Sequence, residues 1–140
     1  MSRIFWDTNL FIYLLEDYGE LSARVAALRK RMRARNDQLY TSTITLGEIL
    51  VKPIEERDDE LAKRYEEVIT SVSVLVPFDR EAARTYANIR RDRTLKAPDA
   101  IQLACASQAR IDLFITNDER LAGKTIGGIQ FIASLRSAFL

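Results

Sequence analysis

Short apolar segments alternate along the chain with longer segments of helical periodicity, and this alternation restricts the fold more than any other feature. Apolar residues recur at intervals of three and four in the longer segments, which predicts amphipathic helices. We expect helices over residues 10–15, 21–32, 44–51, 61–69, 79–93 and 98–109. We expect about five strands, over residues 4–6, 39–42, 72–78, 113–115 and 130–132. The alternation predicts an α/β fold with a central, mainly parallel sheet.

Proline and glycine residues mark several expected boundaries. Pro53 is expected to end the third helix, because a proline lacks the N–H that a helix interior needs. Pro98 suits the first turn of the helix that contains Asp99. Gly127 and Gly128 indicate a turn before the last strand, and a C-terminal helical turn is expected after it.

The composition is that of an ordinary globular protein. Hydrophobic residues make up 47% and charged residues 29% of the chain, which predicts a single folded domain over residues 1–140. No apolar run approaches the ~20 residues of a membrane span, and the first residues do not resemble a signal peptide. We therefore expect a cytoplasmic protein with no membrane partner. The single cysteine, Cys105, excludes an internal disulfide and is expected in the core.

The sequence contains no histidine. This absence excludes histidine-based zinc sites and the catalytic triads in which a histidine activates a serine or cysteine. It also removes the most common general base. If the chain catalyses hydrolysis, carboxylates and a hard metal ion are the remaining tools.

Four acidic residues are predicted to lie at one edge of the sheet. Asp7 follows the first strand, Asp118 follows the fourth, and Glu48 lies in the helix after the second. Ligands of parallel α/β sheets bind at the carboxyl ends of the strands, where these three residues belong. Asp99 begins a helix that runs antiparallel to the strands, which brings it to the same edge.

A divalent metal ion would explain why four carboxylates share this edge. At ~5 Å and an effective dielectric of about 20, each pair of like charges repels by roughly 3 kcal/mol. A fold tolerates such repulsion poorly unless a cation is bound or the pKa values rise. Oxygen ligands without histidine favour Mg²⁺ or Mn²⁺.

Each acid also has a purely structural interpretation. Asp7 is a favoured N-cap, and Asp99 suits the N-terminus of a helix. Capping boxes, in which a hydroxyl and an acid three residues later cap a helix, fit the pairs Thr45 with Glu48 and Thr116 with Glu119.

Four segments of the sequence resemble the PIN-domain family and, within it, the VapC-type toxins of toxin–antitoxin pairs. They are residues 5–13 (FWDTNLFIY), 45–50 (TLGEIL), 97–104 (APDAIQLA) and 114–121 (FITNDERL). Their order and spacing match the family, and the resemblance spans nearly the whole chain. Trp6 departs from the pattern, because a smaller aliphatic residue usually precedes the first aspartate.

The resemblance implies a fold, a metal and an activity. In this family a parallel sheet is sandwiched between helices in three layers, and an acidic cluster binds Mg²⁺ or Mn²⁺ for endonucleolytic cleavage of RNA, often tRNA or other structured RNA. The family's four acidic positions correspond to Asp7, Glu48, Asp99 and Asp118. Its conserved hydroxyl corresponds to Thr116 and its polar position after the first aspartate to Asn9. A toxin of this kind is expected to be a homodimer bound by a cognate antitoxin, with exposed apolar residues among 10–15 as contact points.

The expected mechanism divides the work among these side chains. Asp7 and Asp99 are expected to bind one or two metal ions directly. Asp118 and Glu48 either bind the metal or hold its waters, and one of the four acids acts as the base for the attacking water. The hydroxyl of Thr116 is expected to orient an acid or a phosphate.

Three other functions remain open. A metal-dependent phosphatase of the haloacid-dehalogenase type would need an aspartate where Asn9 stands. An inactive PIN domain that binds proteins is disfavoured because all four acids are present. A PIN ribonuclease that processes RNA without an antitoxin is less favoured, because nothing appended to this short chain suggests another role.

Basic residues are concentrated in two stretches, although the net charge is only +1. Residues 24–35 contain six basic side chains and no acid, so this helix presents either an RNA-binding face or a solvated one. Residues 80–96 are also basic, and Arg91, Arg93 or Lys96 would lie closer to Asp99. The segment 123–125 (GKT) is not a phosphate loop, because the first glycine of that motif is missing.

Overall fold

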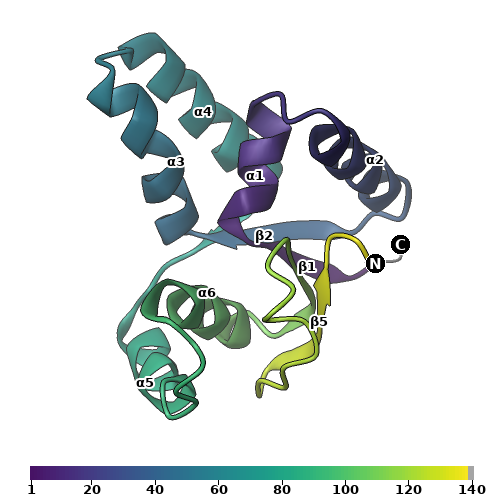
Figure 1. Cartoon of the computed structure of the whole chain (residues 1–140), viewed down its shortest axis with the longest axis vertical. Helices are drawn as coiled ribbons and strands as arrows, with labels where there is room; N and C mark the ends of the chain where they lie inside the picture. Colours follow the sequence, from purple (N-terminus) through teal and green to yellow (C-terminus); the bar gives the residue numbers. More distant parts are fainter. Residues whose placement is uncertain (139–140) are drawn as a thin grey trace.

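The computed structural model describes residues 1–138 and contains a parallel sheet with helices on both faces (Figure 1). The strands are β1 (Arg3–Trp6), β2 (Gln38–Ser42), β3 (Val74–Val76), β4 (Ile111–Thr116) and β5 (Ile129–Ser134). The helices are α1 (Thr8–Leu15), α2 (Glu20–Ala34), α3 (Thr43–Glu55), α4 (Asp59–Val72), α5 (Arg80–Ile89) and α6 (Ala97–Gln108). The α/β prediction is therefore confirmed, including the five strands and their parallel pairing.

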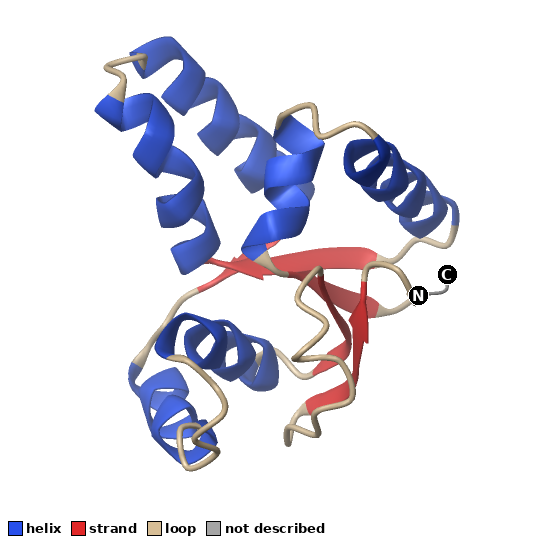
Figure 2. Cartoon of the chain, in the orientation of Figure 1, coloured by secondary structure: helices blue, strands red, loops and turns tan. Residues whose placement is uncertain are grey.

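The strands lie in the sheet in the order β3-β2-β1-β4-β5, so the direction in which the chain adds strands reverses beside β1. The chain moves outward from β1 to β2 and β3, and then returns to add β4 on the other side of β1. Helices α1 to α4 cover one face of the sheet, and α5 and α6 cover the other (Figures 1 and 2). Right-handed connections require this change of face when the direction changes. The connections after β1 and β4 therefore diverge, and sheets of this kind usually bind their ligands at the carboxyl ends of two such strands.

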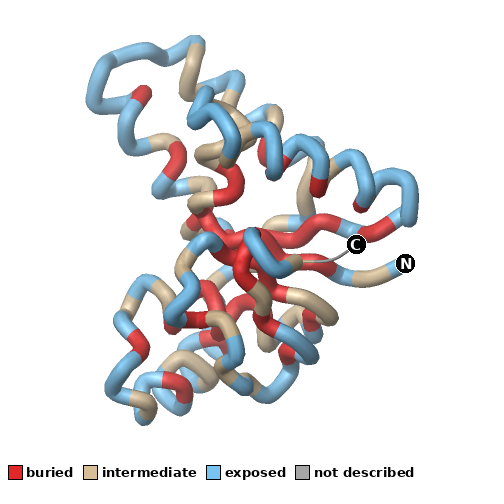
Figure 3. The backbone as a smooth tube through the Cα atoms, turned by 45° about the vertical axis from the view of Figure 1, so that its right-hand side comes forward, coloured by how far each residue is buried: buried red, intermediate tan, exposed pale blue. Residues whose placement is uncertain are grey.

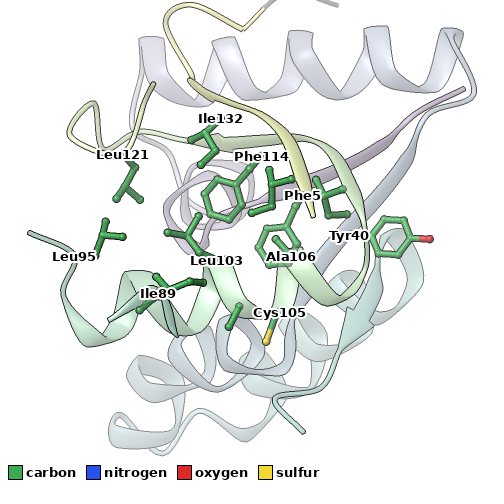
Figure 4. Packing of buried hydrophobic residues seen from close by; sticks show 14 residues of the cluster. Phe5, Tyr40, Ile89, Leu95, Leu103, Cys105, Ala106, Phe114, Leu121 and Ile132 are labelled. Atoms are coloured by element: carbon green, nitrogen blue, oxygen red, sulfur yellow. The ribbon is translucent and has the colours of Figure 1, made fainter. Parts of the chain in front are cut away.

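Two hydrophobic cores, one on each face, hold the helices to the sheet. Buried residues gather along the strands and the helix faces that touch them, whereas the far end of the α3–α4 pair is exposed (Figure 3). Side chains alternate along β1, so Ile4 and Trp6 enter the core under α1 to α4 and Phe5 enters the other. Phe5 is paired in register with Phe114, and their rings stack at 5.1 Å (Figure 4). These contacts fix β1 against β4, where the candidate site lies.

The third strand is shorter than expected. Val72 is the last residue of α4 rather than the start of a strand, because it packs with that helix against the core under α1 to α4. The strand ends at Val76, since Pro77 has no N–H to donate to a neighbouring strand. The expected helix over residues 79–93 ends at Ile89, and consecutive turns then bring the buried Leu95 into the core.

Helix α3 was expected to stop near Pro53, and it ends two residues beyond that proline. Helix α3 continues to Glu55 with Pro53 inside its last turns, where the loss of one N–H removes a single hydrogen bond. The carbonyl of Pro53 accepts a hydrogen bond of 2.8 Å from the N–H of Asp58, which links α3 to α4. Residues 135–137 form a turn rather than the expected helical turn, which otherwise falls on residues outside those described.

The predicted glycine turn is present and fastens β5 to α6. Gly128 has a φ of +86°, and a Cβ there would lie 2.6 Å from the carbonyl oxygen of Ser107. The hydroxyl of Ser107 donates a hydrogen bond of 2.6 Å to the carbonyl of Gly127. Within residues 1–138, no helix is long and apolar enough to span a membrane.

Candidate metal centre

Asp7 stands at the end of β1 with both carboxylate oxygens engaged. It is the N-cap of α1, and its Oδ1 accepts a hydrogen bond of 2.8 Å from the N–H of Thr8. Its Oδ2 accepts one of 2.7 Å from the hydroxyl of Thr116 at the end of β4. The structural interpretation of Asp7 as an N-cap is thus confirmed, and the same carboxylate links the end of β1 to the end of β4.

The electrostatics of Asp7 show that other acids are near. The pKa of Asp7 is raised from 3.8 to about 6. Burial is the largest cause and the charges of Asp99 and Glu48 add to it, against the two hydrogen bonds that lower it. Burial also raises the pKa of Asp99, as does the charge of Asp118. The fold therefore brings Asp99 and Glu48 within electrostatic reach of Asp7, and Asp118 within reach of Asp99, from four separate segments of the chain.

Glu48 reaches this group through Thr8. Its Oε1 accepts a hydrogen bond of 3.2 Å from the Thr8 hydroxyl. Thr45 is not the N-cap of α3, because Ser42 holds that position and accepts from the N–H of Thr45. The capping box expected for Thr45 is therefore wrong. The one expected for Thr116 is wrong too, because that residue ends a strand and no helix follows it.

A buried glutamine that the sequence reasoning missed holds these elements together. The side-chain amide of Gln102 donates to the hydroxyls of Thr8, at 2.9 Å, and Thr45, at 2.7 Å. Its carbonyl accepts from the hydroxyl of Ser42 at 2.5 Å. All four side chains are buried, so the network ties α6 to the starts of α1 and α3. A single polar residue within the apolar run of residues 100–106 was the available signal.

Asp118 is held by a cation from its own loop. Arg120 donates to its two oxygens from Nη2 at 2.6 Å and from Nε at 3.0 Å, and the N–H of Arg120 adds a third bond of 3.0 Å. These hydrogen bonds hold the pKa of Asp118 below its usual value of 3.8. The N–H of Asp118 donates to the Thr116 hydroxyl at 3.0 Å.

Asn9 connects the first turn of α1 to the segment that precedes Asp118. Its Oδ1 accepts a hydrogen bond of 3.2 Å from the N–H of Asn117. The side-chain amide of Asn117 in turn donates to the hydroxyl of Tyr13 at 2.8 Å. Asn9 thus fixes the position of the loop rather than meeting the four acids directly.

The donor set fits a hard divalent cation. All four side chains offer carboxylate oxygens, the ligands that Mg²⁺ and Mn²⁺ prefer. Burial is the main cause of the raised pKa of Asp7 and repulsion by Asp99 and Glu48 a smaller one, and a bound cation would offset both. Within residues 1–138, however, no three acidic, cysteine or histidine side chains already lie close enough to enclose a metal. Asp118 is bound to Arg120 and Glu48 to Thr8, so both side chains would have to turn toward the ion.

Basic side chains lie beside the acids. The charge of Lys96, next to α6, lowers the pKa values of both Asp99 and Asp118. In α2, the apolar stripe of the sequence is buried, which leaves most of its basic residues on the outer face. Arg24 lines a depression of about 420 Å³ together with Asn117 and Arg136, directly beside the loop of Asp118.

Comparison with known proteins identifies the family. The model of the PIN domain matches residues 4–125. The chain belongs to the PIN-domain family. No curated protein matches the sequence of this PIN domain closely enough to count.

Solved structures that resemble this PIN domain are VapC toxins of VapBC toxin–antitoxin systems. A chain in the structure of VapBC2 from Rickettsia felis bound to a promoter DNA fragment superposes with a TM-score of 0.74 at 14% identity, covering 94% of this chain and 98% of that one. A chain of a toxin–antitoxin complex from Klebsiella pneumoniae gives 0.65 at 25% identity, with coverages of 90% and 94%. VapC20 from Mycobacterium tuberculosis, a toxin that cleaves the sarcin–ricin loop, gives 0.63 at 17% identity, with coverages of 87% and 96%.

Proposed function

We propose that residues 1–140 form one PIN domain that acts as an Mg²⁺- or Mn²⁺-dependent endoribonuclease, the toxin of a type II toxin–antitoxin pair. The observation that carries this proposal is the buried carboxylate of Asp7. Its pKa is raised to about 6 by burial and by two neighbouring acids, and its orientation is fixed by Thr116. Perturbed acids that converge in a crevice are typical of catalytic sites.

The four acids divide the work of the site. Asp7 and Asp99 hold the metal, and Glu48 and Asp118 complete its shell directly or through waters. The bound metal supplies a lowered water pKa and stabilises charge on the leaving oxygen. The Thr116 hydroxyl keeps the Asp7 carboxylate in one orientation, and one of the four acids takes the proton of the attacking water.

The proposed substrate is structured RNA. Lys96 stands beside the acids and lowers the pKa values of Asp99 and Asp118, so a phosphate next to the cleaved bond meets positive charge there. In the neighbouring depression, Arg24 and Arg136 are each paired with an acid, Glu20 and Glu119. A toxin of the same fold, 17% identical, cleaves the sarcin–ricin loop, and we propose a structured RNA as the target of this chain too.

The proposed protein partners are a cognate antitoxin and a second copy of the chain. A groove of about 670 Å³ runs between α1, α2 and α4, and its lining combines apolar side chains with arginines. The lining residues are Leu14, Leu15, Leu61, Tyr65, Val68, Ser71 and Val72, with Arg29, Arg33 and Arg64. An amphipathic segment with acidic residues, as expected of an antitoxin tail, complements such a groove.

The test of this function compares cleavage of total RNA by the purified protein in Mg²⁺, in Mn²⁺ and in EDTA. Discrete fragments that need metal are expected, and Asp7→Asn should remove them while the protein stays folded. Asp59→Asn, which changes an exposed acid at the start of α4, is the matched control and should cleave normally. Full activity of the Asp7→Asn variant would contradict the proposal. A folded, metal-binding protein without cleavage would instead favour a binding module.

A further inference from the structure

Arg120 forms the one ion pair in residues 1–138 that includes any of the four acids. Its guanidinium binds Asp118 through two parallel hydrogen bonds. Two such bonds fix the orientation of the arginine relative to the carboxylate. The Arg120 side chain is 68% exposed, and that of Asp118 is 22% exposed. The pair is therefore well formed in geometry but open to solvent, so its partners can separate at small cost.

The position of Arg120 compensates the repulsion among the acids. Its charge lowers the pKa of Asp99, whereas the charge of Asp118 raises it, so the guanidinium acts on both carboxylates. Lys96 acts on the same two acids through its charge but forms no ion pair with them among the described residues. Arg120 thus provides, in part, the neutralisation that a divalent cation provides when it is bound.

The loop keeps Arg120 at the site whatever it binds. The next residue, Leu121, is 2% exposed and packs in the core beneath α5 and α6. Its N–H donates to the carbonyl of Asp118 at 3.1 Å. The backbone of Arg120 is therefore anchored on both sides, and only its side chain is free to turn.

We propose that Arg120 exchanges partners during the reaction: it neutralises Asp118 until a divalent cation takes that carboxylate, and it then binds an RNA phosphate beside the cleaved bond. The inference rests on the proposed nuclease function. A planar guanidinium matches a phosphate as well as a carboxylate, because both present two oxygens to its paired N–H groups. Once displaced, Arg120 is an unpaired cation held next to the metal site, where the phosphate of a substrate must lie.

The first arm of the test measures Mn²⁺ binding by calorimetry, with no RNA present. Wild-type protein is compared with Arg120→Gln and with Arg136→Gln, which removes another exposed arginine in a looser pair with Glu119 at 3.6 Å. Because metal no longer has to displace a cation, Arg120→Gln should bind Mn²⁺ about three- to fivefold more tightly. Arg136→Gln should stay within about twofold of wild type.

These outcomes separate the inference from the function on which it rests. Wild-type protein that binds no Mn²⁺ would overturn the nuclease proposal, and the exchange with it. Unchanged or weaker Mn²⁺ binding by Arg120→Gln, in a protein whose wild type binds the ion, would overturn the exchange alone.

The second arm measures binding of a fluorescent, mixed-sequence oligoribonucleotide in EDTA and in Ca²⁺, with the RNA checked for integrity on a gel. In EDTA, Arg120→Gln should weaken binding only slightly, because Asp118 holds the arginine in wild type and the variant loses only the neutralisation of that carboxylate. In Ca²⁺ the variant should bind several-fold more weakly. The slope of log affinity against log salt concentration should also become shallower by about 0.7, which is what one phosphate contact contributes on single-stranded nucleic acid. Arg120→Lys should recover part of the affinity. Equal weakening in EDTA and in Ca²⁺ would show an ordinary surface charge and overturn the exchange.

Discussion

The hydroxyl of Thr116 donates a hydrogen bond of 2.7 Å to Oδ2 of Asp7, which joins the last residue of β4 to the residue after β1. The same hydroxyl accepts a hydrogen bond from the N–H of Asp118. The single proton of the hydroxyl is therefore donated to Asp7. One side chain therefore sets the orientation of a first acid and the start of the loop that carries a second. Thr116 was predicted to orient an acid or a phosphate, and its hydroxyl donates a hydrogen bond to an acid.

Replacing Thr116 with valine should reduce RNA cleavage at least tenfold while the protein stays folded. Valine keeps the shape but leaves Asp7 and the Asp118 N–H without their partner, which costs roughly 1–3 kcal/mol of stability. Initial cleavage rates and thermal unfolding measure the two effects. Thr116→Ser keeps the hydroxyl and should recover most of the rate. Equal rates for the valine and serine variants would show that the hydroxyl has no role.

The raised pKa of Asp7 predicts an unusual dependence of stability on pH in metal-free protein. The folded state binds a proton at Asp7 with a pKa of about 6, whereas the unfolded chain has the ordinary value of 3.8. The stability that protonation gives is present in full below the lower value, and it is lost as pH rises through the higher one. Asp7→Asn has no carboxylate to desolvate. In EDTA at neutral pH it should therefore exceed wild type by on the order of 3 kcal/mol.

Urea unfolding of both proteins from about pH 3.5 to 7.5 measures this difference. The two curves should converge at the acidic end, where Asp7 is neutral in both states. A stability difference that does not change with pH would mean that the effect of the substitution does not arise from ionisation of Asp7.

Trp6 should tolerate phenylalanine at little cost. Its indole Nε1 is the buried side-chain polar atom that has no hydrogen-bond partner in residues 1–138. Phenylalanine removes this unsatisfied donor, which offsets the smaller ring, so the net change should stay within about 1 kcal/mol. Trp6→Leu also loses the aromatic contact with Phe11 at 5.3 Å and should cost about 2 kcal/mol or more. Circular dichroism in urea compares them, and equal losses would contradict this explanation.

Gly128 and Gly127 should respond very differently to alanine. At Gly128 a Cβ would meet the backbone oxygen of Ser107, and the positive φ disfavours any side chain. Gly128→Ala should therefore destabilise the fold by roughly 2 kcal/mol. Gly127 has open space around its Cα, so Gly127→Ala should change stability little. Thermal unfolding of the pair tests this, and similar midpoints would contradict the contact with Ser107.

The features that the sequence predicted are those with a local cause. Side-chain alternation and apolar stripes are local, so the strands, the helices and the edge on which the four acids lie could be predicted. Pro53 misled the prediction because one missing N–H near the end of a helix removes a single bond. The limits of β3 depended on Val72 packing against the core, which no local pattern reports.

Contacts between distant segments could not be predicted. Gln102 binds side chains that lie 57 to 94 residues away, and such a network is visible only once the sheet has formed. The pairing of Asp118 with Arg120 is local in sequence but depends on which way two side chains turn. Whether the acids bind a metal and cut RNA stays a prediction until it is measured.

The strand order determines when the candidate site can form during synthesis on the ribosome. Asp7 is made early, but its hydrogen-bond partner Thr116 lies on β4, which joins β1 only after most of the chain has been synthesised. The four acids therefore remain scattered on a growing chain, and they meet only when the centre of the sheet closes. A nascent or truncated chain that lacks β4 has no assembled site, so the cell is exposed to the activity proposed here only after β4 has been synthesised and has paired with β1.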